Sequence, residues 1–138
     1  MNRPLKWDVF VSSQIPAVTS ELPPGATEMK WSPISSTLIS GERDAVLVDT
    51  FITMEQNRSL AEWAAASGKN LSAIYATHGH GDHFFGVNTI HQRFPTTHFR
   101  LNPSLSALRS TNVVCATLSV LEGQPAPFRE FCTLSHLP

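Results

Sequence analysis

The sequence predicts a mixed α/β fold built from layers, and three observations support this prediction. Apolar, β-prone runs alternate with a segment of helical periodicity between residues 31 and 101. A helix start signal stands at Thr53, directly before that periodic segment. A loop rich in histidine follows an apolar run. Loops of this kind, outside the carboxyl ends of strands, are where open α/β sheets usually bind ligands.

Strands are predicted for the first part of the chain. Residues 7–12 (WDVFVS) alternate well enough for a short strand, and the prolines and glycine up to Thr27 then predict an irregular surface excursion. Two apolar runs, at 34–39 and 45–48, are joined by the polar sequence SGERD. This pattern predicts a hairpin of two strands that ends at Asp49.

One amphipathic helix and three shorter elements are predicted next. Thr53 and Gln56 have the spacing of a capping box, and apolar residues then recur at helical spacing until Gly68, a natural helix stop. The further elements are a buried strand at 71–76, a short helix at 86–94 and a strand at 97–101.

Composition and charge exclude several classes of function. The 138 residues are 41% apolar and carry a net charge of −1 with no run of Lys or Arg, so neither nucleic acid nor a membrane is expected as a partner. No stretch approaches the roughly 18 apolar residues of a membrane span, and the N-terminus is a poor secretory signal. Cys115 and Cys132 show no zinc-ligand spacing. We therefore expect a reduced, cytoplasmic protein, whose oligomeric state the sequence leaves open.

The stretch THGHGDHFFG, residues 77–86, contains three of the six histidines of the chain. In an extended loop, residues two apart project to the same side, so His78 and His80 can bind one metal ion. Asp82 and His83 are adjacent and diverge from that pair, which suits a second ion. Imidazole and carboxylate favour zinc, although iron and manganese sites accept the same set. Two ions about 3.5–4 Å apart would lower the pKa of a bound water to about 7, so the predicted chemistry is hydrolysis. A solvated polar loop is the alternative interpretation.

This loop and its surroundings resemble the metallo-β-lactamase fold superfamily. The resemblance rests on THGHGDH, on LSAIYA before it and on STLISGERDAVLVDT, over residues 31–95 and more weakly to about 110. It implies an αββα sandwich, incomplete here, with residues 1–110 as its N-terminal half. It also implies that His78 and His80 bind a first metal ion and Asp82 and His83 a second. Asp82 would also steer protons around a metal-bound hydroxide that attacks an ester, thioester, lactone or amide. Asp49 matches an aspartate that orders the site without binding metal; a strand-end turn residue is the alternative.

The second half of the superfamily's site has no match in this sequence. The resemblance implies a further histidine, a bridging aspartate and a last histidine, but no aspartate follows Asp82. The remaining candidates are His91, His98, Glu122, Glu130 and His136. Of these, His91 and His98 fall within predicted elements and are expected to be surface or packing residues. Residues 111–138 show no clear period beyond a possible strand at 112–121, and we expect a truncated or out-of-frame end.

The predicted function is a metal-dependent hydrolase that acts on a small molecule. The alternative is a catalytically inactive fragment that binds metal weakly or pairs its exposed sheet edge with another chain. A thiol enzyme based on Cys115 or Cys132 is the third hypothesis and the least favoured. Neither cysteine has a neighbouring histidine or helix start to lower its pKa.

Overall fold

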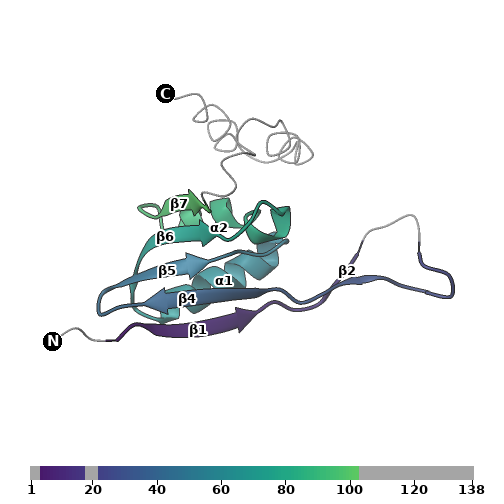
Figure 1. Cartoon of the computed structure of the whole chain (residues 1–138), viewed down its shortest axis with the longest axis horizontal. Coiled ribbons are helices and arrows are strands. Elements are labelled where there is room, and N and C mark those ends of the chain that lie inside the picture. Colours follow the sequence, from purple (N-terminus) through teal and green to yellow (C-terminus); the bar gives the residue numbers. More distant parts are fainter. Residues whose placement is uncertain (1–3, 18–21, 103–138) are drawn as a thin grey trace, which may run out of the picture.

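A five-stranded mixed sheet and two helices make up the main body of the protein (Figure 1). The computed structural model describes residues 4–17 and 22–102. The strands of the sheet are, in spatial order, β1 (Lys6–Val11), β4 (Ser35–Ser40), β5 (Asp44–Val48), β6 (Asn70–Ala76) and β7 (His98–Leu101). The helices are α1 (Met54–Ala66) and α2 (Val87–Arg93), and a 3-10 turn, η1, spans Gly81–His83. A separate two-stranded pair, β2 (Ile15–Pro16) and β3 (Lys30–Trp31), forms an arm that leaves the sheet.

Strand direction divides the sheet into two parts. β1 pairs with β4, and β4 with β5, in antiparallel fashion, while β5, β6 and β7 are parallel to one another. Parallel strands end at the same edge of a sheet. The carboxyl ends of β5, β6 and β7 are therefore neighbours, and the segments that follow them meet there.

The boundaries of α1 follow from its sequence. The Thr53 hydroxyl accepts a hydrogen bond from the Gln56 backbone N–H (3.2 Å), and the Gln56 side chain accepts one from the Thr53 N–H (3.1 Å). This is the predicted capping box, and it satisfies two of the free donors at the start of the helix. The helix stops before Gly68, whose φ of +67° is a conformation that favours glycine.

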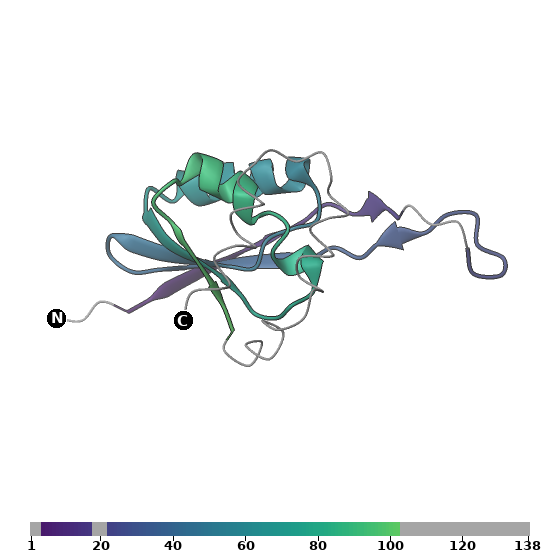
Figure 2. The same ribbon diagram turned by 90° about the horizontal axis from the view of Figure 1, so that it is seen from above.

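The hydrophobic core lies between the sheet and its helices. Leu38 and Leu47 point from β4 and β5 toward Leu60 of α1 and Ile90 of α2, and Phe51 is fully buried in the turn between β5 and α1. Burial of each such side chain contributes about 1.5–3 kcal/mol to stability. Both helices lie on the same side of the sheet (Figure 2), so this core forms on that face alone.

The opposite face of β1 is apolar and exposed. Trp7, Val9 and Val11 alternate along the strand, and their side chains are 70%, 46% and 59% exposed. Within residues 4–17 and 22–102, the helices cover only the other face of the sheet. The alternation of apolar residues identifies β1 as a strand, but Trp7, Val9 and Val11 lie on its exposed face and not on its buried one.

The structure confirms the predicted α/β class and the elements expected up to residue 101, with ends shifted by one or two residues. One detail differs. The region up to Thr27 was expected to be irregular, but Ile15 and Pro16 pair with Trp31 and Lys30 in the arm. Pro16 is tolerated because this pair has no further strand beside it. The strand expected at 112–121 lies outside the described residues. None of the described helices has the length and apolar character required to cross a membrane.

Candidate metal centre

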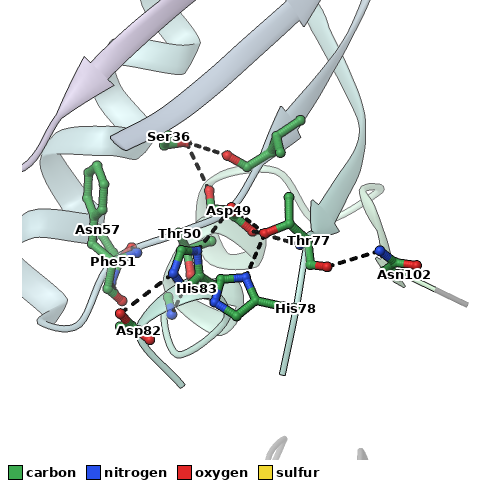
Figure 3. A network of polar contacts seen from close by, with 12 residues as sticks. Ser36, Asp49, Thr50, Phe51, Asn57, Thr77, His78, Asp82, His83 and Asn102 are labelled. Atoms are coloured by element: carbon green, nitrogen blue, oxygen red, sulfur yellow. Dashed lines mark hydrogen bonds and ion pairs between the residues drawn. The ribbon is translucent and has the colours of Figure 1, made fainter. Parts of the chain in front are cut away.

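The histidine loop lies where the three parallel strands end (Figure 3). Asp49 follows β5, Thr77 follows β6 and Asn102 follows β7. Asn102 connects two of these ends, because its backbone N–H donates to the Ala76 carbonyl (3.1 Å) and its side chain donates to the Thr77 carbonyl (3.1 Å). The sheet itself therefore gathers the residues of the candidate site at one edge.

A tight turn shapes the loop after His80. The His83 N–H donates to the His80 carbonyl (3.0 Å), and the Phe85 N–H donates to the Gly81 carbonyl (2.7 Å). The Phe85 ring lies so close over Gly81 that an added Cβ would stand 2.0 Å from its Cζ atom. Only glycine fits at position 81 without moving that ring.

Thr50 attaches the loop to the end of β5. Its N–H donates to the His83 carbonyl (2.9 Å), and its hydroxyl accepts from the Gly86 N–H (3.0 Å). Thr50 is fully buried. The position of the His83 backbone is therefore set from β5 as well as from β6.

Three imidazole rings gather in this loop. The ring centroids of His78 and His80 are 4.7 Å apart, and those of His78 and His83 are 3.9 Å apart. His80 is exposed, while His78, Asp82 and His83 are half-buried. The sequence predicted that Asp82 and His83 diverge from the pair formed by His78 and His80. For His83 this is wrong, because the 3-10 turn carries its ring back against His78, while Asp82 Oδ2 lies 3.6 Å from His83 Nε2.

The backbone of Asp49 adopts a left-handed conformation, with φ of 63°. Among residues other than glycine, Asp and Asn tolerate this region best, at a cost of about 1–3 kcal/mol. Hydrogen bonds hold it in place. The Asp49 N–H donates to the Tyr75 carbonyl (2.9 Å), and the buried Ser36 hydroxyl donates to the Asp49 carbonyl (2.9 Å).

The Asp49 carboxylate faces the start of the loop. It accepts hydrogen bonds from the Thr77 N–H at Oδ1 (2.8 Å) and from the Thr77 hydroxyl at Oδ2 (2.8 Å). Its Oδ2 also lies 3.0 Å from His83 Nδ1. That contact is close but not aligned, since Nδ1 of His83 is buried and makes no hydrogen bond with the described residues. Asp49 thus contacts both the first residue of the motif and its last histidine.

The donor set fits a zinc ion in its chemistry. Three imidazoles and the Asp82 carboxylate are ligands that zinc accepts. The Asp49 carboxylate lies next to His83, and carboxylates beside ligating histidines are common around metal sites. As the side chains lie, no three His, Cys, Asp or Glu residues of the described chain converge on a common point. Binding would thus need side-chain rotation within the loop, and the exposed His80 has the room for it.

Two other histidines are located as the sequence predicted. His91 lies in α2, and His98 is the first residue of β7. Partial burial lowers the pKa of His91, and the charge of His98 lowers it further. The other candidates lie outside the described residues: Cys115, Glu122, Glu130, Cys132 and His136.

Sequence reasoning overlooked four residues that order the site. Thr50, Thr77 and Ser36 act through their hydroxyls, and Asn57 of α1 holds the Phe51 backbone by hydrogen bonds at its N–H (2.9 Å) and its carbonyl (2.9 Å). Two of them could have been found. Thr50 and Thr77 each stand one or two residues past a predicted strand end, beside a predicted site residue. Ser36 and Asn57 have no such position in the sequence.

Comparison with known protein families identifies the family of this chain. The family model described as the metallo-beta-lactamase superfamily matches residues 29–110. The chain belongs to the metallo-beta-lactamase superfamily. The matched region contains the whole histidine loop together with β4, β5, β6 and β7. Proteins of this superfamily generally bind metal ions, usually zinc.

Among solved structures, the chain is similar to a metallo beta lactamase from Hirschia baltica, with 23% sequence identity and a TM-score of 0.44. The match covers 76% of this chain and 47% of that protein, so the chain spans about half of that protein's length. No curated protein matches the chain.

Proposed function

We propose that this member of the metallo-beta-lactamase superfamily is a metal-dependent hydrolase that uses the loop from His78 to His83. The observation that carries the proposal is the gathering of three imidazoles at the carboxyl ends of parallel strands, with ring centroids 3.9 and 4.7 Å apart. Family membership and the Asp49 contacts behind the loop give further support.

The ligands proposed are His78, His80, Asp82 and His83. His78 and His80 would hold a first ion, and Asp82 with His83 would hold a second, with zinc preferred over iron or manganese. Asp49 would order these ligands rather than bind metal. When bound, such ions polarise a carbonyl oxygen and acidify a water molecule at neutral pH.

The residues of the chain would contribute binding and proton transfer. Asp82 is half-buried, with Oδ2 3.6 Å from His83 Nε2, so its carboxylate can accept a proton at the site without being shut off from solvent. The substrate would be a small molecule with an ester, thioester, lactone or amide bond. A net charge of −1 with no run of Lys or Arg gives no electrostatic reason to expect nucleic acid or an anionic membrane as the partner.

Metal content is the first test. The purified full chain is loaded with Zn²⁺, dialysed and measured by mass spectrometry, next to His78→Ala/His80→Ala. His98→Ala is the matched control, because it removes a histidine outside the loop. We expect bound zinc in the wild type and the control and its loss from the double variant. A folded wild type that retains no zinc would contradict the proposal.

Turnover is the second test. Zinc-loaded protein is assayed with an activated ester, a thioester and a lactone, with and without chelator. Hydrolysis that is abolished by chelator and reduced at least about 100-fold by Asp82→Ala is expected if Asp82 transfers protons. Hydrolysis that survives the chelator would exclude a metal-dependent mechanism.

A second candidate function is metal binding without hydrolysis, in a chain that pairs with another protein. Two observations favour it. Residues 84–102 contain no Asp, Glu or Cys, and the four proposed ligands all come from a single loop. Trp7, Val9 and Val11 also present an exposed apolar stripe. Zinc bound at one ion per chain with no turnover would favour this candidate over the hydrolase.

A further inference from the structure

The Thr77 side chain lies between the Asp49 carboxylate and the first histidine of the loop (Figure 3). Its Oγ1 atom is 2.8 Å from Asp49 Oδ2 and 3.1 Å from Asp49 Oδ1. The same Oγ1 atom is 2.9 Å from His78 Nδ1. A single hydroxyl therefore connects a carboxylate to an imidazole.

Only one placement of the protons is consistent with these contacts between Asp49, Thr77 and His78. A hydroxyl has one proton to donate, and an ionised carboxylate can only accept. If the Thr77 proton went to His78 Nδ1, lone pairs of Oγ1 and Oδ2 would face each other at 2.8 Å. If the proton goes to Asp49, Oγ1 is free to accept from His78, and Nδ1 must then be the protonated ring nitrogen. The contacts of the Thr77 hydroxyl with Asp49 and with His78 are both hydrogen bonds only in this second arrangement.

We propose that Thr77 is a positioning residue that fixes the tautomer of His78, with the proton on Nδ1 and the lone pair on Nε2. Neutral histidine in water prefers the opposite tautomer, with the proton on Nε2. The tautomer of a histidine is set by the hydrogen bond that its other nitrogen makes. Thr77 thus prepares Nε2 as a metal-binding atom before any ion arrives, and in this respect the inference rests on the proposed function.

The role of the hydroxyl can be separated from the role of the Thr77 backbone. The Thr77 N–H donates to Asp49 Oδ1 (2.8 Å), and its carbonyl accepts from the Asn102 side chain (3.1 Å). Neither bond involves the hydroxyl, so Thr77→Val, which has the same shape, keeps the backbone anchored. Thr77→Ser keeps the hydroxyl and is the matched control.

The test is the tautomer itself, measured without metal. Nitrogen-15 labelled full chain is stripped of metal, and the two-bond ¹H–¹⁵N correlations of the histidine rings are recorded at about pH 8, with His78→Ala used to assign the signal. We expect Nδ1–H in the wild type and in Thr77→Ser. In Thr77→Val we expect a shift to mainly Nε2–H. Nε2–H in the wild type, or an unchanged tautomer in Thr77→Val, would overturn the proposal.

Zinc affinity gives a second measurement, by competition with a chromophoric chelator. We expect Thr77→Val to bind zinc about 10–100-fold more weakly, the range typical for loss of a group that orients a metal ligand. Thr77→Ser and His98→Ala should stay within about threefold of the wild type. Equal affinity in Thr77→Val would show that the hydroxyl has no bearing on binding.

The two measurements separate this inference from the proposed function. If the wild type binds no zinc but has Nδ1–H on His78, the proposed function fails and the tautomer assignment stands. If Thr77→Val does not fold, the wild-type spectrum still decides, because Nε2–H there overturns the assignment.

Discussion

Asn57 and Gly86 should show strong energetic coupling, because they occupy one small space behind the loop. The Asn57 side chain is 1% exposed. It accepts from the Phe51 N–H (2.9 Å) and donates to the carbonyls of Phe51 (2.9 Å) and Thr53 (2.7 Å). A Cβ on Gly86 would lie 2.0 Å from Asn57 Oδ1. Alanine at 86 would therefore force the amide out of its place.

The magnitude follows from the groups left without partners. Asn57→Ala orphans the N–H and the carbonyl of the buried Phe51, whereas the Thr53 carbonyl keeps the Asn57 backbone N–H (3.0 Å). At about 1–3 kcal/mol for each orphaned group, the expected loss of stability is about 2–6 kcal/mol. Gly86→Ala should cost a similar amount, since its φ of −78° suits alanine and the clash alone decides the outcome. In the double variant the clash is relieved, so the second change should add less than about 1 kcal/mol.

The assay is urea unfolding of the full chain, followed by tryptophan fluorescence and circular dichroism. We compare the free energy of unfolding of the wild type, the two single variants and the double variant, whose m-values should agree. Asn70→Ala is the matched control, since this exposed asparagine makes one side-chain hydrogen bond to Asp44 (2.8 Å) and should combine additively with Gly86→Ala. Additivity of Asn57→Ala and Gly86→Ala within about 0.5 kcal/mol would refute the reasoning.

Two further predictions concern the support of the site and the response to pH. Ser36→Ala removes the buried hydrogen bond to the Asp49 carbonyl (2.9 Å) and should lower the free energy of unfolding by about 1–3 kcal/mol in urea, and an unchanged midpoint would contradict this. The pKa of His91 is lowered from 6.5 by burial and then by the charge of His98. The unfolded chain therefore binds this proton more readily, and the stability due to neutral His91 is present above pH 6.5 and lost as the pH falls through that value. His91→Gln should lose less stability than the wild type between about pH 7.5 and about pH 5, and parallel losses would exclude this role for His91.

Local rules were sufficient for most of the fold. The capping box at Thr53, the stop at Gly68 and the alternation in residues 7–12 each depend on neighbours within a few positions, and each was confirmed. The arm formed by β2 and β3 was missed because its pairing joins residues about 15 apart across a proline-rich stretch, with no apolar pattern to mark it.

The candidate site was predicted in its residues but not in its arrangement. His78, His80, Asp82 and His83 stand out from the sequence because of their density. The return of the His83 ring to within 3.9 Å of His78 depends on the 3-10 turn and on the Thr50 hydrogen bond from the end of β5. Such contacts cross from one strand end to another, and spacing along the chain does not contain them.

The sequence by itself determined the class of fold, the order of the elements, the loop with its candidate ligands and the resemblance to the metallo-β-lactamase superfamily. Each of these follows from periodicity, caps and motif spacing, which are local properties of the chain. Only the tertiary structure decided how the parallel strand ends bring Asp49 against Thr77 and His83, and which hydroxyls order the histidines. The physical reason is that Asp49 lies 28 positions before Thr77 in the chain, so that only the pairing of β5 with β6 makes them neighbours.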